Sequence, residues 1–405
     1  MTQGRLSPWV RFRTDAGEWF DADEIRRGRE YVRPLGFMRA AQWAIGASVA
    51  LAFVEGRRAE DVIDGLGARG WIVQLVVVVA AIELTGLVFR PWFSAWRVFV
   101  HDRRWDLSTQ GAQGWAADQV KGVLLDLALT SALMIPLYAL MRTTDRWWVW
   151  GWLVFTAFAV LFGFLFPVVF APIFNKFERL ADPDLEARIT RVADRAGLKI
   201  EGVYVANASV RSRATNAYVA GLGSTRRVVL FDTILAWPPA LLEQVVAHEL
   251  GHWRHGHLAR QLPLLAVVQF AAFGAMAWVF SASAVLDWIG VAGPGDPRTL
   301  PFFLLVYPAI LGGATLVLAW LSRAYERQAD LHALSVLDDP AAFQAAFRRL
   351  AADNVVDVDP PWWQRIRHGH PPVPERMAMA AAWEARDEPD AGPGDGTSRR
   401  GRAGR

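Results

Sequence analysis

Six long apolar runs constrain what this chain can fold into more than any other feature of its sequence. A helix needs roughly 20 apolar residues to cross the hydrocarbon core of a bilayer, and amphipathic surface helices are not apolar on every face. The runs lie near residues 36–55, 71–96, 122–142, 148–172, 260–283 and 300–321. The first run is the weakest and predicts a shorter or tilted span. We therefore predict an α-helical multi-pass membrane protein with about six transmembrane helices.

Composition agrees with a membrane protein and excludes several kinds of site. Hydrophobic residues make up 53% of the chain, charged residues 20%, and the 20 tryptophans suit the membrane–water interfaces. Cysteine is absent, which excludes disulfides, thiolate catalysis and cysteine-based zinc sites. A metal would have to bind His, Asp and Glu. No basic stretch is interleaved with aromatic residues, so we expect the bilayer as a partner and no nucleic acid.

The distribution of arginine predicts the orientation of the spans. Residues 1–35 are polar and arginine-rich, unlike a signal peptide, and the segments 97–121 and 173–259 are also rich in arginine. The loop at 284–299 holds only Arg298. With six spans the three basic segments fall on one side, which the positive-inside rule makes cytoplasmic. We predict a cell-membrane protein whose large polar segment faces the cytoplasm.

Two carboxylates, Glu83 and Asp126, lie inside apolar runs. An acid in a transmembrane segment is a candidate functional group, but it can also pair with another polar residue of the bundle. We expect both side chains to face the bundle interior or water and to pair with a neighbouring polar group.

A metal-binding motif follows the fourth run and reads His248-Glu249-Leu250-Gly251-His252. Histidines four residues apart lie on the same face of a helix, one turn apart, so both imidazoles can bind one ion. The glutamate beside the first histidine can then act as general base on a metal-bound water. The residues before the motif continue a helix, as the motif requires. This pattern predicts a zinc metalloendopeptidase with one zinc ion per chain.

The third ligand and its support lie farther along the chain. A catalytic zinc takes three protein ligands and a water, and Glu326 is the best candidate for the third. Asp330 lies one helical turn later, where it can accept the second N–H of a zinc-binding histidine and fix its tautomer.

The sequence divides into six predicted regions. Within the polar insert we expect an amphipathic helix at 182–197, a strand at 203–205, a hairpin at 217–231 and a helix from Pro238 to about His255. The regions are a polar N-terminal segment (1–35), a four-span membrane region (36–172), a metalloprotease insert (173–259), two further membrane helices (260–321), a third-ligand helix with the C-terminal part of the catalytic domain (322–383) and a disordered tail (384–405).

Separated blocks of this sequence resemble the CAAX prenyl protease type 1 family of membrane zinc metallopeptidases. The resemblance runs from roughly residue 75 to 380. The blocks are Ala171–Phe177, Asn216–Tyr218, Arg227–Thr233, His248–Trp253, Glu326–Asp330, His370–Pro372 and Glu375–Arg376.

The resemblance implies a role for each matching residue. An α+β catalytic domain would carry zinc on His248, His252 and Glu326, with Glu249 as base, and the helices would enclose a chamber. Asp330 and Arg376 would support the ligands from behind, and His370 would stabilise the oxyanion. Residues Asn216, Ala217 and Tyr218 would form an edge strand that pairs with an extended substrate, a mode that depends little on side chains. Substrates would be membrane-associated or C-terminal peptides, including prenylated ones.

The N-terminus departs from the pattern of this family. Family members usually begin with one more transmembrane helix, whereas residues 1–35 are polar here.

Two further histidines, His255 and His257, follow the motif, and His257 lies one and a half turns beyond His252. We expect both to serve interface or capping roles, with His257 facing away from the metal.

Other functions fit the sequence less well. A heat-shock-type membrane quality-control metalloprotease shares the zinc motif and stays open as an alternative. An intramembrane site-2-type protease would carry the motif inside an apolar span, but polar Glu243 and Gln244 precede it. A non-catalytic scaffold predicts a broken ligand set, and a transporter predicts two similar halves, neither of which the sequence has. The oligomeric state is left open.

Overall fold

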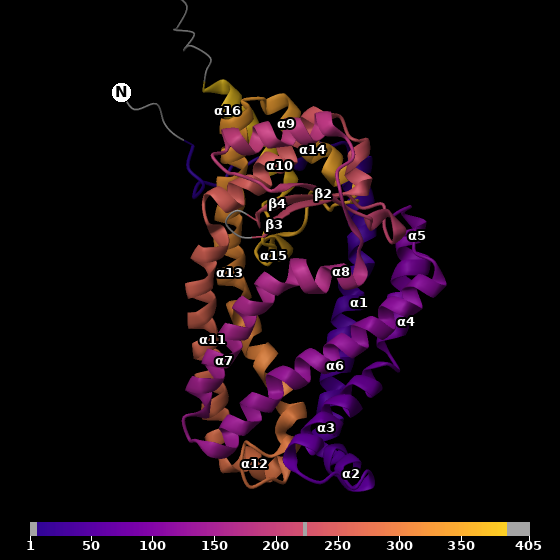
Figure 1. Cartoon of the computed structure of the whole chain (residues 1–405), viewed down its shortest axis with the longest axis vertical. Coiled ribbons are helices and arrows are strands. Elements are labelled where there is room, and N and C mark those ends of the chain that lie inside the picture. The colour runs from indigo at the N-terminus through magenta and orange to yellow at the C-terminus, as the bar shows by residue number, and fades with distance from the viewer. Residues whose placement is uncertain (1–5, 222–224, 387–405) are drawn as a thin grey trace, which may run out of the picture.

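A computed structural model describes residues 6–221 and 225–386 of the chain. Figure 1 shows long helices in a bundle, with a head of shorter helices and a small sheet at one end. The long helices are α1 (Ala22–Glu55), α3 (Trp71–Gly86), α6 (Ala112–Thr143), α7 (Trp147–Leu165), α11 (His257–Ser281) and α13 (Leu300–Leu337). The shorter ones are α2 (Arg58–Gly65), α4 (Arg90–Trp96), α5 (Asp102–Arg104), α8 (Ala171–Phe174), α9 (Pro183–Arg195), α10 (Pro239–Arg254), α12 (Ser283–Ile289), α14 (Pro340–Asp353), α15 (Trp362–Arg365) and α16 (Val373–Ala385), with π-helical η2 (Arg97–His101) and η3 (Phe166–Phe170).

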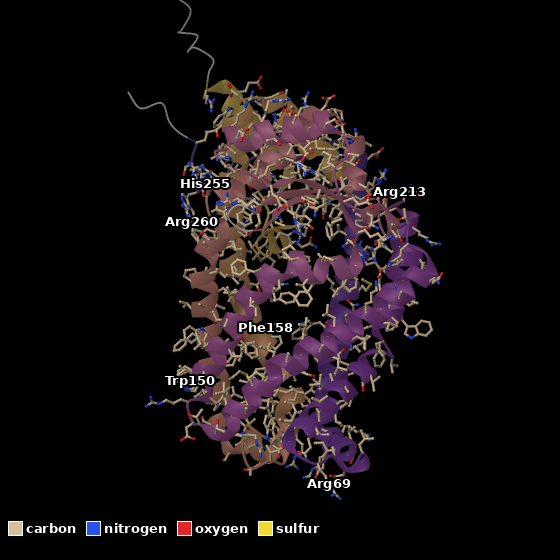
Figure 2. All side chains as sticks on the ribbon, in the orientation of Figure 1. Arg69, Trp150, Phe158, Arg213, His255 and Arg260 are labelled. Atoms are coloured by element: carbon tan, nitrogen blue, oxygen red, sulfur yellow. The ribbon has the colours of Figure 1, made fainter. Side chains whose placement is uncertain are left out.

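Six helical stretches of the described residues are long and apolar enough to cross a membrane, which confirms the predicted number. They are Ala22–Glu55, Trp71–Arg104, Ala112–Thr143, Trp147–Phe174, His257–Ser281 and Pro297–Leu337. Carbon atoms dominate the belt around Trp150 and Phe158, whereas nitrogen and oxygen atoms gather at the two ends of the molecule (Figure 2). A cavity of about 540 Å³ lies between α1, α3 and α13.

The first span starts earlier than the sequence pattern indicates. Asp21 accepts the backbone N–H groups of Asp23 and Glu24, and Glu24 accepts the N–H of Asp21 in return. This capping box satisfies the free donors of a helix start, so α1 begins at Ala22 and its arginine-rich first half runs straight into the span. The boundary predicted at 35/36 therefore falls inside one helix.

The head contains a four-stranded sheet in the order β1-β2-β4-β3. Its strands are β1 (Phe177–Arg179), β2 (Gly202–Ala206), β3 (Ala217–Ala220) and β4 (Arg227–Phe231). Strands β2 and β4 are parallel, and β3 pairs with β4 as the predicted antiparallel hairpin. The predicted hairpin tip at 222–224 lies outside the described residues. Among the described residues β4 is the one strand beside β3, so β3 forms an edge of the sheet.

Helices α9 and α10 close the core of the head. The predicted apolar face of α9 is buried, with Leu185, Ile189 and Val192 at most 9% exposed. These residues belong to one core cluster with Val228 and Leu230 of β4. The amphipathic helix and the helix that begins near Pro238 are both confirmed.

Two membrane helices continue into the head without a break. α13 runs for 38 residues, and α11 begins at His257. The boundaries predicted at 259/260 and 321/322 therefore fall inside helices, and α11 continues through Pro263. α16 extends through Ala385, two residues into the predicted tail, and residues 387–405 lie outside the described residues.

The two carboxylates of the membrane region share one arginine. Arg90 pairs with Glu83, and its guanidinium lies 3.7 Å from the carboxylate of Asp126. Glu83 and Arg90 also line the cavity between α1, α3 and α13. The expectation of a polar partner within the bundle is confirmed, and the arginine cross-links α3 to α6.

The docking of α1 on the C-terminal segment yields a stability prediction. A Cβ at Gly28 would collide with the carbonyl oxygen of Val356 and lie 2.9 Å from Cα of Asp357, so Gly28→Ala must displace backbone. We expect a loss of about 1–3 kcal/mol, measured as a lower unfolding temperature of the detergent-solubilised protein.

Gly36 of the same helix supplies the matched control. A Cβ at Gly36 meets nothing within 4 Å, so Gly36→Ala should leave stability unchanged or raise it by up to about 1 kcal/mol through helix propensity. Equal effects of the two substitutions would contradict the close packing of α1 on residues 356–357.

Candidate metal centre

The site lies where helices α10 and α13 cross at close range. α10 packs along α13, and a Cβ at Gly251 would lie 3.0 Å from Cα and 3.1 Å from the carbonyl oxygen of Ala329. Glycine at this position lets the two backbones approach, since a side chain would have to push α13 away. The approach brings the face of α10 that carries His248 and His252 against Glu326 of α13.

Three side chains meet at one point of this crossing. The Nε2 atoms of His248 and His252 lie 3.2 Å apart, and each lies 3.4 Å from an oxygen of the Glu326 carboxylate. The ligand atoms all lie within 4.8 Å of one another. For bonds of about 2.0–2.1 Å at tetrahedral angles, zinc ligands would be separated by about 3.3–3.4 Å.

The residues present fit a metal ion. Glu326 is 5% exposed, and its buried Oε2 has no hydrogen-bond partner among the described residues. A buried carboxylate oxygen without a partner is costly, and a cation between the three ligands would satisfy it. The set of two imidazoles and one carboxylate matches the ligands of catalytic zinc sites.

His248 is held from behind by an acid, as the sequence predicts. Its Nδ1 lies 2.8 Å from Oδ1 of Asp330, which is fully buried. Because a carboxylate only accepts, Nδ1 carries a proton, and Nε2 is the nitrogen that can bind a metal once it is deprotonated. Arg376 pairs with Asp330, with Nε 2.9 Å from Oδ2, and its guanidinium stacks 3.7 Å from the ring centre of Phe347.

His252 is held by a residue that the sequence interpretation missed. The Nδ1 atoms of His252 and His257 lie 2.9 Å apart, and Nε2 of His257 lies 2.9 Å from Oε1 of Gln328. The amide oxygen accepts from Nε2–H of His257, which leaves Nδ1 of His257 to accept from Nδ1–H of His252. His257 also stacks on Tyr325, with ring centroids 4.4 Å apart.

The expectation that His257 faces away from the metal is therefore wrong, and Gly256 is the reason. α10 ends at Arg254 with His255 at its C-cap, and Gly256 adopts a left-handed conformation with φ +63°. The chain turns there and starts α11 at His257, so helical geometry cannot be extended from His252. The glycine directly before His257 is the sequence signal for this turn.

The candidate base is uncommitted. Glu249 is half-buried, and its carboxylate forms no hydrogen bond or ion pair with any residue that the structure describes. Burial raises the pKa of Glu249, while the positive charges of His248 and His252 oppose the shift. A carboxylate with a raised pKa is a stronger base, as proton abstraction from water requires.

The other predicted site residues surround this centre. His370 is exposed, and its Nε2 lies 3.4 Å from Oε1 of Glu326. Asn216 directly precedes the edge strand β3, which holds Ala217 and Tyr218. The indole N–H of Trp253, next to the motif, donates to the carbonyl of Val219 at 3.2 Å and ties the edge strand to α10.

Two family models match this chain. Residues 179–384 match peptidase family M48, and residues 21–176 match the N-terminal region of CAAX prenyl proteases, described as five membrane helices. The described part of 21–176 holds four of the six candidate spans. The family pattern thus has one more membrane helix than this region, in line with the departure noted in the sequence.

Relatives of known sequence or structure include bacterial and eukaryotic proteins. The uncharacterized metalloprotease YhfN of Bacillus subtilis is 29% identical over 68% of this chain and 66% of its own length. CAAX prenyl protease 1 of Saccharomyces cerevisiae is 26% identical over 73% of this chain and 69% of its own. The crystal structure of S. mikatae Ste24p superimposes with a TM-score of 0.79 at 20% identity, covering 92% of each chain, and shares the fold.

The contact between His252 and His257 predicts a specific effect on metal affinity. His257→Ala leaves Nδ1 of His252 without its acceptor, and loss of such an outer partner typically weakens metal binding about 10- to 100-fold. Competition with a chelator of known affinity measures this change. His257→Asn, whose side-chain oxygen can accept in place of Nδ1, should recover part of the affinity; equal losses in both variants, or no loss, would contradict this role.

Metal affinity should also depend on pH. Burial and the charge of Arg376 would lower the pKa of His248, but Asp330 and Glu326 raise it to about 9 in the metal-free protein. Below that pH a proton must leave His248 before a metal binds, so apparent affinity should rise about tenfold per pH unit between pH 6 and 8. Calorimetric titration in buffers of different ionisation enthalpy counts the released proton, and a pH-independent affinity would refute the coupling.

Proposed function

The chain belongs to peptidase family M48, and from that premise we propose that it is a zinc endopeptidase that cleaves C-terminal peptides of membrane-associated polypeptides. It is an integral membrane metalloendopeptidase. The observation that carries the choice of zinc is the convergence of His248, His252 and Glu326 at one buried point, beside the unpaired carboxylate of Glu249. His248, His252 and Glu326 would hold the ion.

The proposed chemistry is hydrolysis of a peptide bond by water. When bound, zinc lowers the pKa of a water and polarises the scissile carbonyl. Glu249 accepts the proton of the attacking water on its carboxylate and passes it to the leaving nitrogen. His370 donates an N–H to the oxyanion that develops on the carbonyl oxygen. Asp330 and Arg376 hold the ring of His248 so that its Nε2 faces His252 and Glu326, where the ion would bind.

Substrate would bind as an added strand. β3 lies at the edge of the sheet, and the bond from Trp253 to the carbonyl of Val219 fixes that edge against the helix of the motif. Main-chain pairing of this kind gives affinity without a strict sequence requirement. The names of the relatives called CAAX prenyl protease support peptides with a prenylated cysteine near the C-terminus as substrates of this chain. The arginine-rich segments favour a catalytic side that faces the cytoplasm.

A membrane quality-control protease is the second candidate. Strand pairing tolerates many sequences, and the bacterial relative YhfN is named as a metalloprotease without a substrate. Matched prenylated and unprenylated peptides separate the candidates, since a prenyl requirement favours C-terminal processing and equal cleavage favours quality control.

The role of Glu249 yields the central prediction. Glu249→Gln removes the base but none of the ligands, so kcat should fall about 10²- to 10⁴-fold while zinc content is retained. Peptidase assays and metal analysis of the purified full-length protein measure both quantities. His252→Ala is the control that should lose zinc and activity together. Retained activity in the glutamine variant would refute the mechanism.

A further inference from the structure

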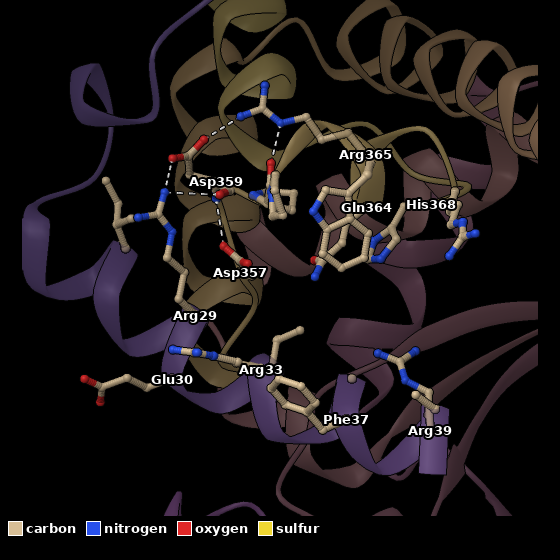
Figure 3. A pocket seen from close by; sticks show the side chains of 18 of the residues that line it. Arg29, Glu30, Arg33, Phe37, Arg39, Asp357, Asp359, Gln364, Arg365 and His368 are labelled. Atoms are coloured by element: carbon tan, nitrogen blue, oxygen red, sulfur yellow. Dashed lines mark hydrogen bonds and ion pairs between the residues drawn. The ribbon is translucent and has the colours of Figure 1, made fainter. Parts of the chain in front are cut away.

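A large cavity lies next to the segment that leads to His370. A cavity of about 1430 Å³ separates the first half of α1 from residues 357–368, which include α15 (Figure 3). None of the three candidate metal ligands lines it, so it is distinct from the metal centre itself. The face of α1 that lines it changes along the helix from Arg26, Arg29 and Arg33 to apolar Phe37 and Trp43.

Cations outnumber carboxylates around this cavity. Six arginines face three carboxylates, and the carboxylate of Asp359 is already shared by two arginines. The arginines are Arg26, Arg29, Arg33, Arg39, Arg365 and Arg367, and the carboxylates are Glu30, Asp357 and Asp359.

Three of these arginines have no carboxylate partner in the part of the chain that the structure describes. The guanidinium groups of Arg33 and Arg367 form no ion pair or hydrogen bond among the described residues, and that of Arg39 bonds only the carbonyl of Leu35, at 3.3 Å. Arg26, in contrast, pairs with Asp23 and Glu30 of its own helix. The cavity therefore holds uncompensated positive charge that suits an anionic ligand.

Arg39, one of the uncommitted cations, lies at the end of the cavity that holds His368. In Figure 3, Arg29 and Asp359 occupy one end of the cavity, and Arg39 and His368 occupy the other. The positive charge of Arg39 contributes, after burial, to lowering the pKa of His368, which agrees with their closeness. His368 is two residues from His370, whose Nε2 lies 3.4 Å from Glu326.

The cavity wall is attached to the helix that carries Glu326. Arg323, one turn before Glu326, donates to the carbonyls of Arg365 and Ile366 at 3.1 Å and of His368 at 2.7 Å. Arg367 lies three residue steps before His370, so their Cα atoms are at most about 11 Å apart, which is also the reach of three extended substrate residues. Arg367 therefore lies within a few substrate residues of His370, the predicted oxyanion donor.

We propose that Arg39 and Arg367 bind the C-terminal carboxylate of the substrate, so that cleavage occurs a fixed, short distance from the chain end. This inference rests on the proposed endopeptidase function and specifies its substrate as a free C-terminus. Arginine binds a carboxylate through two parallel N–H donors, and the apolar lower part of the cavity accommodates apolar side chains next to that terminus. A lipid phosphate would fit the same charges, but nothing in lipid binding requires them to adjoin the loop that carries His370.

Peptide binding to the full-length, zinc-loaded Glu249→Gln protein tests this directly. One fluorescent peptide is made with a free C-terminal carboxylate and with a C-terminal amide, and anisotropy gives both Kd values. We expect the acid to bind at least about tenfold more tightly than the amide, since hydrogen bonds to a charged carboxylate are stronger than those to a neutral amide. Adding Arg39→Gln and Arg367→Gln should reduce the ratio to near one by weakening only the acid. Arg26→Gln, at a cavity arginine with its own partners, should keep the ratio.

The outcomes separate the possible failures. Equal affinity for acid and amide, or a preference that survives the double substitution, overturns the carboxylate site even if the enzyme cleaves peptides. A preference for the acid in an enzyme that hydrolyses neither peptide supports the carboxylate site and rejects the proposed function. The same variants are then placed in phosphatidylcholine nanodiscs with and without phosphatidylglycerol. If the double variant no longer binds phosphatidylglycerol but keeps the acid-to-amide ratio of Kd values, the cavity is a lipid headgroup site and the proposal is wrong.

Discussion

The close crossing of α10 and α13 is the contact on which the candidate site depends. Gly251 sits on the backbone of Ala329, and the absent side chain sets how near the two helices come. His248 and His252 on one helix and Glu326 on the other are about 80 residues apart in sequence but meet within 4.8 Å. Helical periodicity can align two ligands, but a third ligand from another helix needs a crossing of fixed separation. Oε2 of the buried Glu326 carboxylate has no hydrogen-bond partner among the described residues at that crossing, and a cation there would satisfy it.

The two candidate histidine ligands are positioned by different chemistry. Asp330 accepts from Nδ1 of His248, and Arg376 compensates the charge of that buried acid. A neutral pair, His257 and Gln328, takes the corresponding place behind His252. An acid raises the electron density on its imidazole more than a neutral acceptor does, so the two ligands differ in basicity while both keep Nε2 free. All four supporting side chains come from α11, α13 and α16, so the packing of these helices also orients the ligands.

Membrane and catalytic parts share helices and are not joined by flexible linkers. α11 carries His257 at its first residue, and α13 carries Glu326, Gln328 and Asp330 beyond its apolar part. Arg323 then fixes the loop of His370 to the same helix. A membrane helix that extends into the head holds the site at a fixed distance from the apolar part of that helix. The cavity between α1 and residues 357–368 lies at the same junction.

Local patterns in the sequence determined much of this protein. The apolar runs indicated six spans, periodicity indicated α9 and α10, and the spacing of His248, Glu249 and His252 indicated a metal motif, because each signal involves residues within one helix. The pairing of Glu326 and Asp330 with that motif came from ligand chemistry and family resemblance. Only the tertiary structure decided that His257 supports His252, since a left-handed glycine redirects the chain between them. The tertiary structure alone placed Arg39 near His368, which is more than 300 residues away in the sequence. Such contacts arise from helix packing, which sequence spacing does not encode.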